Sequence, residues 1–173
     1  MGMPKKLKNF GVFGDGESWL GEVPSITLPT ITKKMEEYRG GGMHGPVQLE
    51  MGHEKLELQL KSGGIKPQLI AMLGAGAVGA SVLRFAGAYQ NDATGQVVAA
   101  EVICRGRLME WNPGEAKPGD NNEHDFKFAL SYYKVTVDGA DLLEIDVPGM
   151  LWKVGGTDVY ASIRLAIGLA LPA

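Results

Sequence analysis

The amino-acid sequence predicts a mainly β protein with one or two short helices. Three observations support this class: several segments alternate apolar and polar residues at period two, turn-forming residues separate these segments, and no regular succession of strands and helices is present. The chain has 173 residues, which suits one domain with its own hydrophobic core. Its 25 glycines follow no fixed period and therefore indicate many turns.

Three hairpins are predicted where alternating segments flank a tight turn. The segment pairs are 8–13 with 17–23, 81–89 with 96–111, and 124–137 with 142–147. The turns between them are Gly14-Asp15-Gly16, the polar stretch 90–95 and Asp138-Gly139, all rich in residues that tolerate turn geometry. Within 124–137 the apolar phase shifts by one residue between Tyr132 and Tyr133, which indicates a bulge or bend.

Two further strands and one irregular segment are predicted in the first third of the chain. Residues 24–30 form an edge or bent strand, because Pro29 cannot donate to a ladder. Residues 54–62 alternate cleanly, with Leu56, Leu58 and Leu60 facing the core and Glu57, Gln59 and Lys61 facing water. Residues 36–50 contain so many glycines that no regular structure is expected there.

Two helices complete the predicted elements. Residues 65–73 suit a short helix, since Pro67 is tolerated in a first turn and the following residues supply an apolar side. A second helix is expected near 157–168, with Asp158 or Thr157 as its N-cap.

The stretch "LGAGAVGA" contains Gly74, Gly76 and Gly79 at the spacing of a dinucleotide-binding loop. Such a loop needs a strand directly before it and a helix directly after it. Hairpin patterns lie on both sides instead, so a connector is strongly favoured and a dinucleotide-binding enzyme is a remote alternative. Asp92 and Glu101 lie near the distance expected for a ribose-binding acid and keep this alternative open.

Composition argues against several other functions. The net charge of −3 does not favour tight DNA binding. His44, His53, His124 and Cys104 share no metal-ligand spacing, so no metal site is predicted. No catalytic triad pattern stands out, and no cofactor is expected. The sequence shows neither a secretory signal nor a membrane-spanning stretch, and no membrane anchor is expected.

Three long segments carry a specific resemblance: residues 25–47 (SITLPTITKKMEEYRGGGMHGPV), 84–120 (RFAGAYQNDATGQVVAAEVICRGRLMEWNPGEAKPGD) and 131–146 (SYYKVTVDGADLLEID). In this order they resemble the major tail tube proteins of contractile-tailed bacteriophages and of R-type tailocins. The resemblance extends from about Lys6 to about Gly168. It does not include the run from Gly74 to Ala80, and residues 169–173 extend beyond the usual end of the family.

The resemblance implies an antiparallel β-sandwich or partial barrel that forms a hexameric, β-lined ring. The chain would be a single tail-tube domain, residues 1–173, with an extended N-terminal segment and a projecting loop near 36–62. Stacked rings would form a hollow tube inside a contractile sheath, without catalytic residues. A tailocin or a toxin-delivery device is the alternative setting. The expected inter-ring contacts are Tyr38, Arg39, Gly40, Gly41, Gly42 and Met43.

The same resemblance implies the partners and the location of the chain. The partners would be identical chains in a homo-hexamer, the tail sheath protein, the baseplate and tail terminator proteins, and tape measure protein and DNA passing through the lumen without sequence-specific binding. The protein would be assembled in the host cytoplasm and end in the tail tube of the virion. The wet face of residues 54–62 leads to the hypothesis that Glu57, Gln59 and Lys61 line the lumen.

Overall fold

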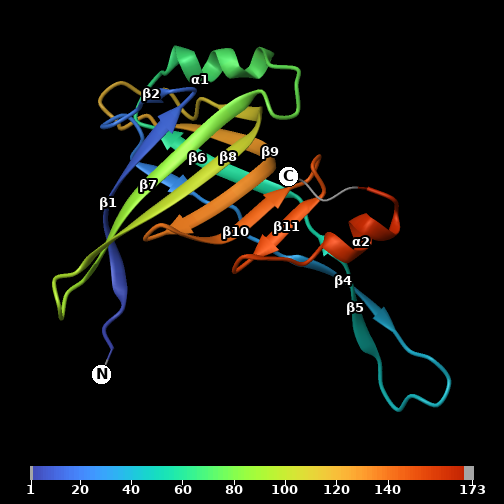
Figure 1. Cartoon of the computed structure of the whole chain (residues 1–173). Coiled ribbons are helices and arrows are strands. Elements are labelled where there is room, and N and C mark those ends of the chain that lie inside the picture. The colour runs from blue at the N-terminus through green and yellow to red at the C-terminus, as the bar shows by residue number, and fades with distance from the viewer. Residues whose placement is uncertain (1, 170–173) are drawn as a thin grey trace.

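The computed structural model describes residues 2–169, and these form an antiparallel β fold with short helices (Figure 1). The strands are β1 (Lys5–Gly14), β2 (Glu17–Ser18), β3 (Ser25–Thr27), β4 (Lys33–Tyr38), β5 (Val47–His53), β6 (Leu56–Ser62), β7 (Ser81–Asn91), β8 (Val97–Asn112), β9 (His124–Val137), β10 (Ala140–Asp146), β11 (Leu151–Val154) and β12 (Thr157–Asp158). The helices are α1 (Pro67–Ala71), the 3-10 helix η1 (Met72–Gly74) and α2 (Ala161–Ala166).

Ten of these strands belong to one branched sheet. Its main path runs β12-β11-β10-β9-β8-β7-β1-β2, and β6 pairs with the first half of β9 while carrying β3 on its outer side. The path does not return to its start, so the sheet is open within one chain. The mainly β, antiparallel class is confirmed. The hairpins β1–β2, β7–β8 and β9–β10 are also confirmed, because their turns lie where the sequence places them.

A β-bulge in the middle of β9 explains the predicted change of phase. Arg105 of β8 pairs with Tyr132, but Gly106 pairs with Leu130, so Ser131 is the extra residue. Ser131 is buried. The strands approach so closely here that a Cβ on Gly106 would lie 2.2 Å from the carbonyl oxygen of Ala129. The bulge bends the sheet, and β9 pairs with β6 before the bend and with β10 after it.

The hydrophobic core lies against β6 and the first half of β9. Leu58 pairs with Phe128 and Leu60 with Phe126, and all four side chains are fully buried. The predicted inward face of residues 54–62 is therefore confirmed. Leu69 of α1 and Trp19 pack into the same core, which explains why a five-residue helix is stable here: packing of its apolar side compensates for its short length.

The expectation of irregular structure for residues 36–50 is wrong. Residues 33–38 and 47–53 form β4 and β5, which pair only with each other and stand away from the main sheet (Figure 1). The glycines at 40–42 and 45 lie in the turn rather than in the strands, so they permit the hairpin. The projection expected near 36–62 also ends earlier, because β6 lies within the main sheet.

The C-terminal helix is shorter than the expected span of 157–168. Thr157 and Asp158 form β12, and α2 begins only at Ala161. Asp158 is not an N-cap: its Oδ1 accepts the backbone N–H of Tyr160 at 3.1 Å, and its Oδ2 accepts from Arg164 at 2.6 Å. Arg164 also donates to the carbonyl of Met150 at 2.7 Å and is almost completely buried. Of the extension predicted at 169–173, residues 170–173 lie outside the described residues.

Candidate assembly surfaces

The tip of the β4–β5 hairpin is an ordered turn. The N–H of Met43 donates to the carbonyl of Gly40 at 3.3 Å, and the guanidinium Nε of Arg39 donates to the carbonyl of Met43 at 3.3 Å. Gly42 has a φ of 82°, which an L side chain adopts only with strain. The six residues predicted as inter-ring contacts thus lie together at the end of the hairpin that is farthest from the sheet (Figure 1).

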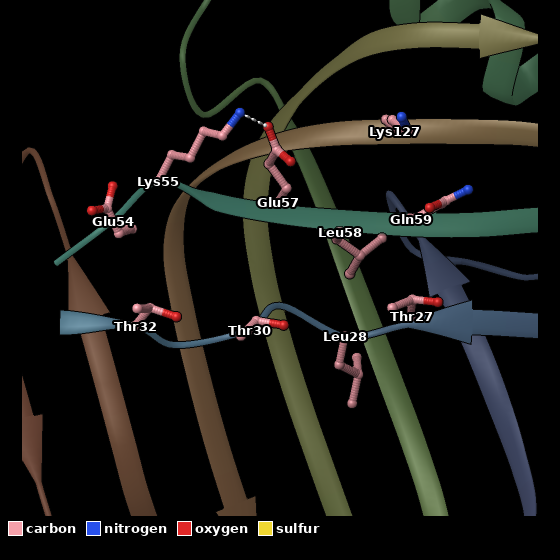
Figure 2. A pocket seen from close by; sticks show the side chains of 10 residues that line it. All are labelled: Thr27, Leu28, Thr30, Thr32, Glu54, Lys55, Glu57, Leu58, Gln59 and Lys127. Atoms are coloured by element: carbon pink, nitrogen blue, oxygen red, sulfur yellow. Dashed lines mark ion pairs between the residues drawn. The ribbon is translucent and has the colours of Figure 1, made fainter. Parts of the chain in front are cut away.

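The outer face of β6 carries polar side chains that form ion pairs. Figure 2 shows Glu57 and Gln59 on one side of the strand and Leu58 on the other. Lys55 Nζ forms an ion pair with Glu57 Oε1 at 2.8 Å, and this hydrogen-bonded contact raises the pKa of Lys55 above its usual value. Lys61 lies 3.9 Å from Asp125 of the neighbouring strand β9. The residues predicted to line the lumen therefore share one solvent-facing surface with balanced charges.

A hollow of about 430 Å³ opens beside this surface (Figure 2). It exists because β3 pairs with β6 only as far as Thr27, after which Pro29 ends the pairing. Contact resumes where the N–H of Glu54 donates to the carbonyl of Thr32 at 2.8 Å. The prediction of an edge or bent strand at Pro29 is confirmed. The hollow is lined by Thr27, Leu28, Thr30, Thr32, Glu54, Lys55, Glu57, Leu58, Gln59 and Lys127.

Strand β1 presents a long unpaired edge. On one side it pairs with β7 from Lys5 to Gly14. On the other side, pairing within residues 2–169 begins only at Val12, whose carbonyl accepts the backbone N–H of Trp19 at 2.9 Å. It continues with the short strand β2, which pairs with the last two residues of β1. The edge from Lys5 to Gly11 therefore leaves main-chain donors and acceptors available to another strand.

The three motif glycines lie in a connection between a helix and an antiparallel strand. Gly74 ends η1, and Gly76 and Gly79 lead into β7. A dinucleotide loop has the opposite order, strand then helix, so this arrangement lacks the helix N-terminus that would hold a pyrophosphate. The predicted connector is confirmed. Asp92 and Glu101 lie apart from this connection, Asp92 in an ion pair with Lys8 at 2.7 Å and Glu101 with Arg84 at 2.9 Å.

The cysteine and two of the histidines, which could carry out catalysis or bind a metal, instead make packing contacts and hydrogen bonds within the fold. Burial raises the pKa of the Cys104 thiol to about 12, so it stays protonated at neutral pH. His124 accepts a hydrogen bond from the indole Nε1 of Trp111 at 3.1 Å, and His53 contacts the ring of Trp152 edge-on. Among residues 2–169 no three His, Cys, Asp or Glu side chains gather as metal ligands. Across this same range no helix combines the length and apolar character needed to cross a bilayer.

Sequence reasoning missed one surface, the side face of the hairpin. Tyr38 pairs with Val47, and alternation places Leu49 and Met51 on the same face. All four side chains are between 45% and 55% exposed. The alternation of Val47, Leu49 and Met51 is visible in the sequence, but the glycines on both sides of it favour a loop.

Comparison with known proteins gives a consistent result. The family model for phage tail tube protein FII matches residues 4–168. The chain is 42% identical to the tail tube protein of Escherichia phage P2 over 98% of this chain and 100% of that protein. It is 39% identical to the major tail tube protein of Serratia phage KSP20 over 98% of this chain and 99% of that protein.

Solved structures support the same fold at low sequence identity. The chain is similar to a chain of the PVC sheath-tube complex in the extended state, with a TM-score of 0.55, 15% identity and coverage of 78% of this chain and 90% of the other. It is also similar to a chain of the anti-feeding prophage cap, a tube-terminating cap, with a TM-score of 0.56, 16% identity and coverage of 79% and 93%. The family model and the two nearly full-length sequence matches show that the chain belongs to the phage tail tube protein FII family.

Proposed function

We propose that this chain is the structural subunit of a phage tail tube, and that six copies form a ring whose stacks make a hollow conduit for DNA ejection. The observation that carries the proposal is the 42% identity to a tail tube protein across 98% of this chain. The open sheet supports it, because closing strand edges around a ring converts unpaired main-chain groups into contacts between subunits. The unpaired edge of β1, from Lys5 to Gly11, would form hydrogen bonds with a strand of the neighbouring protomer.

We also propose the surfaces and partners of this assembly. The hairpin tip, Tyr38 to Met43, contacts the adjacent ring, and Glu57, Gln59 and Lys61 face the lumen. A lumen with paired charges suits a conduit, since unpaired lysines and arginines would bind DNA phosphates and slow its passage. Sheath, terminator and baseplate proteins are the partners, as the related assemblies with sheath-tube, terminator and baseplate components suggest. The role is structural rather than enzymatic.

Deleting residues 40–43 is expected to prevent ring stacking while preserving the fold. The deletion shortens only the turn of a hairpin that pairs with no strand of the main sheet. Electron microscopy of the purified protein should show single rings or unassembled subunits, and circular dichroism should match the wild type. Tubes of normal length from the deletion variant would contradict the assignment of the tip.

Replacing Glu57 with lysine is expected to leave tubes intact and slow genome ejection. The change removes the partner of Lys55 and adds a cation to the proposed lumen surface, which increases salt-dependent attraction to DNA. Ejection can be followed by dye binding to released DNA at low and high salt, with Glu57→Gln as the control that removes charge without reversing it. Equal ejection rates for all three proteins would refute the lumen assignment.

Electron micrographs of the particles that contain this protein distinguish a phage from the alternative, a tailocin or toxin-delivery device. A phage requires a capsid joined to the tail, whereas a tailocin lacks one, so micrographs of particles from the producing cell decide between them. The tube architecture proposed for the chain is the same in both settings.

A further inference from the structure

The side face of the β4–β5 hairpin forms an apolar strip that no other described part of the chain covers. The strip consists of Tyr38, Val47, Leu49 and Met51, each about half exposed. A two-stranded hairpin is marginally stable by itself in water, and its apolar face gains stability only when another surface covers it. The opposite face carries the exposed polar residues Glu37, Gln48 and Glu50, with Met35 as its one exposed apolar side chain. The strip is therefore the face that is suited to a partner.

A second group of exposed apolar side chains flanks α1 in the chain. In Figure 1 the hairpin leaves the sheet at the end away from α1. Beside α1, the aliphatic side chains of Ile65, Leu73 and Val78 are 73%, 42% and 54% exposed. We call these three residues the α1 patch. Two uncovered apolar surfaces, one on the hairpin and one flanking α1, allow a head-to-tail contact between copies that repeats along an axis.

Charges beside the two surfaces are complementary. Glu36 shares the face of the strip, since it pairs with Leu49 in the hairpin. Arg107 lies beside the α1 patch, where its guanidinium donates to the carbonyl of Gly76 at 3.2 Å. Among the ion pairs of residues 2–169, neither Glu36 nor Arg107 takes part. Opposite charges at the rim of an apolar contact fix its register.

We propose that the apolar strip packs against the α1 patch of a second copy stacked in the same orientation, with Glu36 facing Arg107 of that copy. This inference rests on the proposed tube function and names the surface that receives the hairpin. The hairpin tip fixes the end of the contact, whereas the strip supplies most of its apolar area. Stacking would then depend on the side of the hairpin as well as on its turn.

The first test compares two aspartate substitutions on opposite faces of the hairpin. In full-length protein, Leu49→Asp should reduce the amount of pelleted tube by more than about tenfold, because a charge enters a covered apolar contact. Gln48→Asp, one residue away on the polar face, should assemble like the wild type. Both variants should keep the wild-type circular dichroism spectrum and melting temperature. Normal assembly of Leu49→Asp would overturn the proposal.

The second test identifies the receiving surface by exchanging charges. Glu36→Arg and Arg107→Glu should each weaken tube formation, and the double variant should restore it. Failure of the double variant to assemble better than the single variants would exclude this pairing. Wild-type protein imaged in parallel separates the two levels: absence of stacked rings in the wild type contradicts the tube function itself, whereas stacked rings in wild type and Leu49→Asp alike contradict only the strip.

Discussion

Replacing Gly106 with alanine is expected to lower the free energy of unfolding by about 3 kcal/mol, at the upper end of the cost of overpacking a core. The new Cβ would lie 2.2 Å from the carbonyl oxygen of Ala129 and 2.9 Å from the Cα of Leu130. Both contacts are with backbone atoms, so no side-chain rotation relieves them and the strands must separate at the bulge. Urea unfolding of the full-length protein measures the change.

Gly74→Ala is the matched control for this substitution. A Cβ at Gly74 meets no atom within 4 Å, so the free energy of unfolding should change by less than about 0.5 kcal/mol. Gly74 is the first glycine of the dinucleotide-like spacing, whereas Gly106 belongs to no motif. Equal stability of the two variants would show that the close approach of β8 and β9 at the bulge is not required for folding.

Replacing Arg164 with methionine is expected to cost about 3 kcal/mol and to release α2 from β11 and β12. The change leaves Asp158 without its cation and the carbonyl of Met150 without its donor, in a place where the guanidinium is almost fully buried. Hydrogen exchange of amides in residues 158–168 should accelerate more than exchange in β8 and β9. Lys117→Met, which removes an exposed pair with Asp120, should change stability by less than about 0.5 kcal/mol.

The pH dependence of this pair has a defined sign. The hydrogen bond from Arg164 lowers the pKa of Asp158 below its usual value of 3.8. The stabilisation is therefore fully present above the pKa of the unfolded chain and is lost as the pH falls through the lowered folded value. The stability difference between wild type and Arg164→Met should be constant above about pH 5 and should shrink in stronger acid. A difference that grows on acidification would contradict the ion-pair account.

The local patterns of the sequence predict much of the fold. Alternation of Leu56, Leu58 and Leu60 identifies β6 as a strand with one buried face, and Asp138-Gly139 identifies the turn of the β9–β10 hairpin. Both signals are local, since they depend on side-chain period and on backbone angles within a few residues. The phase change in β9 also predicts a bulge, although the need for Gly106 on the opposite strand depends on the register between β8 and β9. Register is a property of the sheet that neither strand encodes alone.

The errors of prediction have the same origin. The strands β4 and β5 contain exposed apolar residues and flank a glycine-rich turn, so their composition resembles that of a loop. Asp158 has the sequence context of an N-cap, but it lies in β12, and its carboxylate accepts a hydrogen bond from Arg164 within α2, which begins only at Ala161. The role of the apolar strip cannot be predicted from the contacts within one chain, because its proposed partner is another copy.

The central claim of this account is that free strand edges of neighbouring protomers pair to close a ring. Cryo-electron microscopy of the assembled protein at a resolution that shows the main chain tests it most directly. The account predicts six protomers per ring, with the edge of β1 from Lys5 to Gly11 hydrogen-bonded to a strand of the adjacent protomer. A ring in which this edge faces solvent, or is covered by residues of its own chain, would contradict the claim.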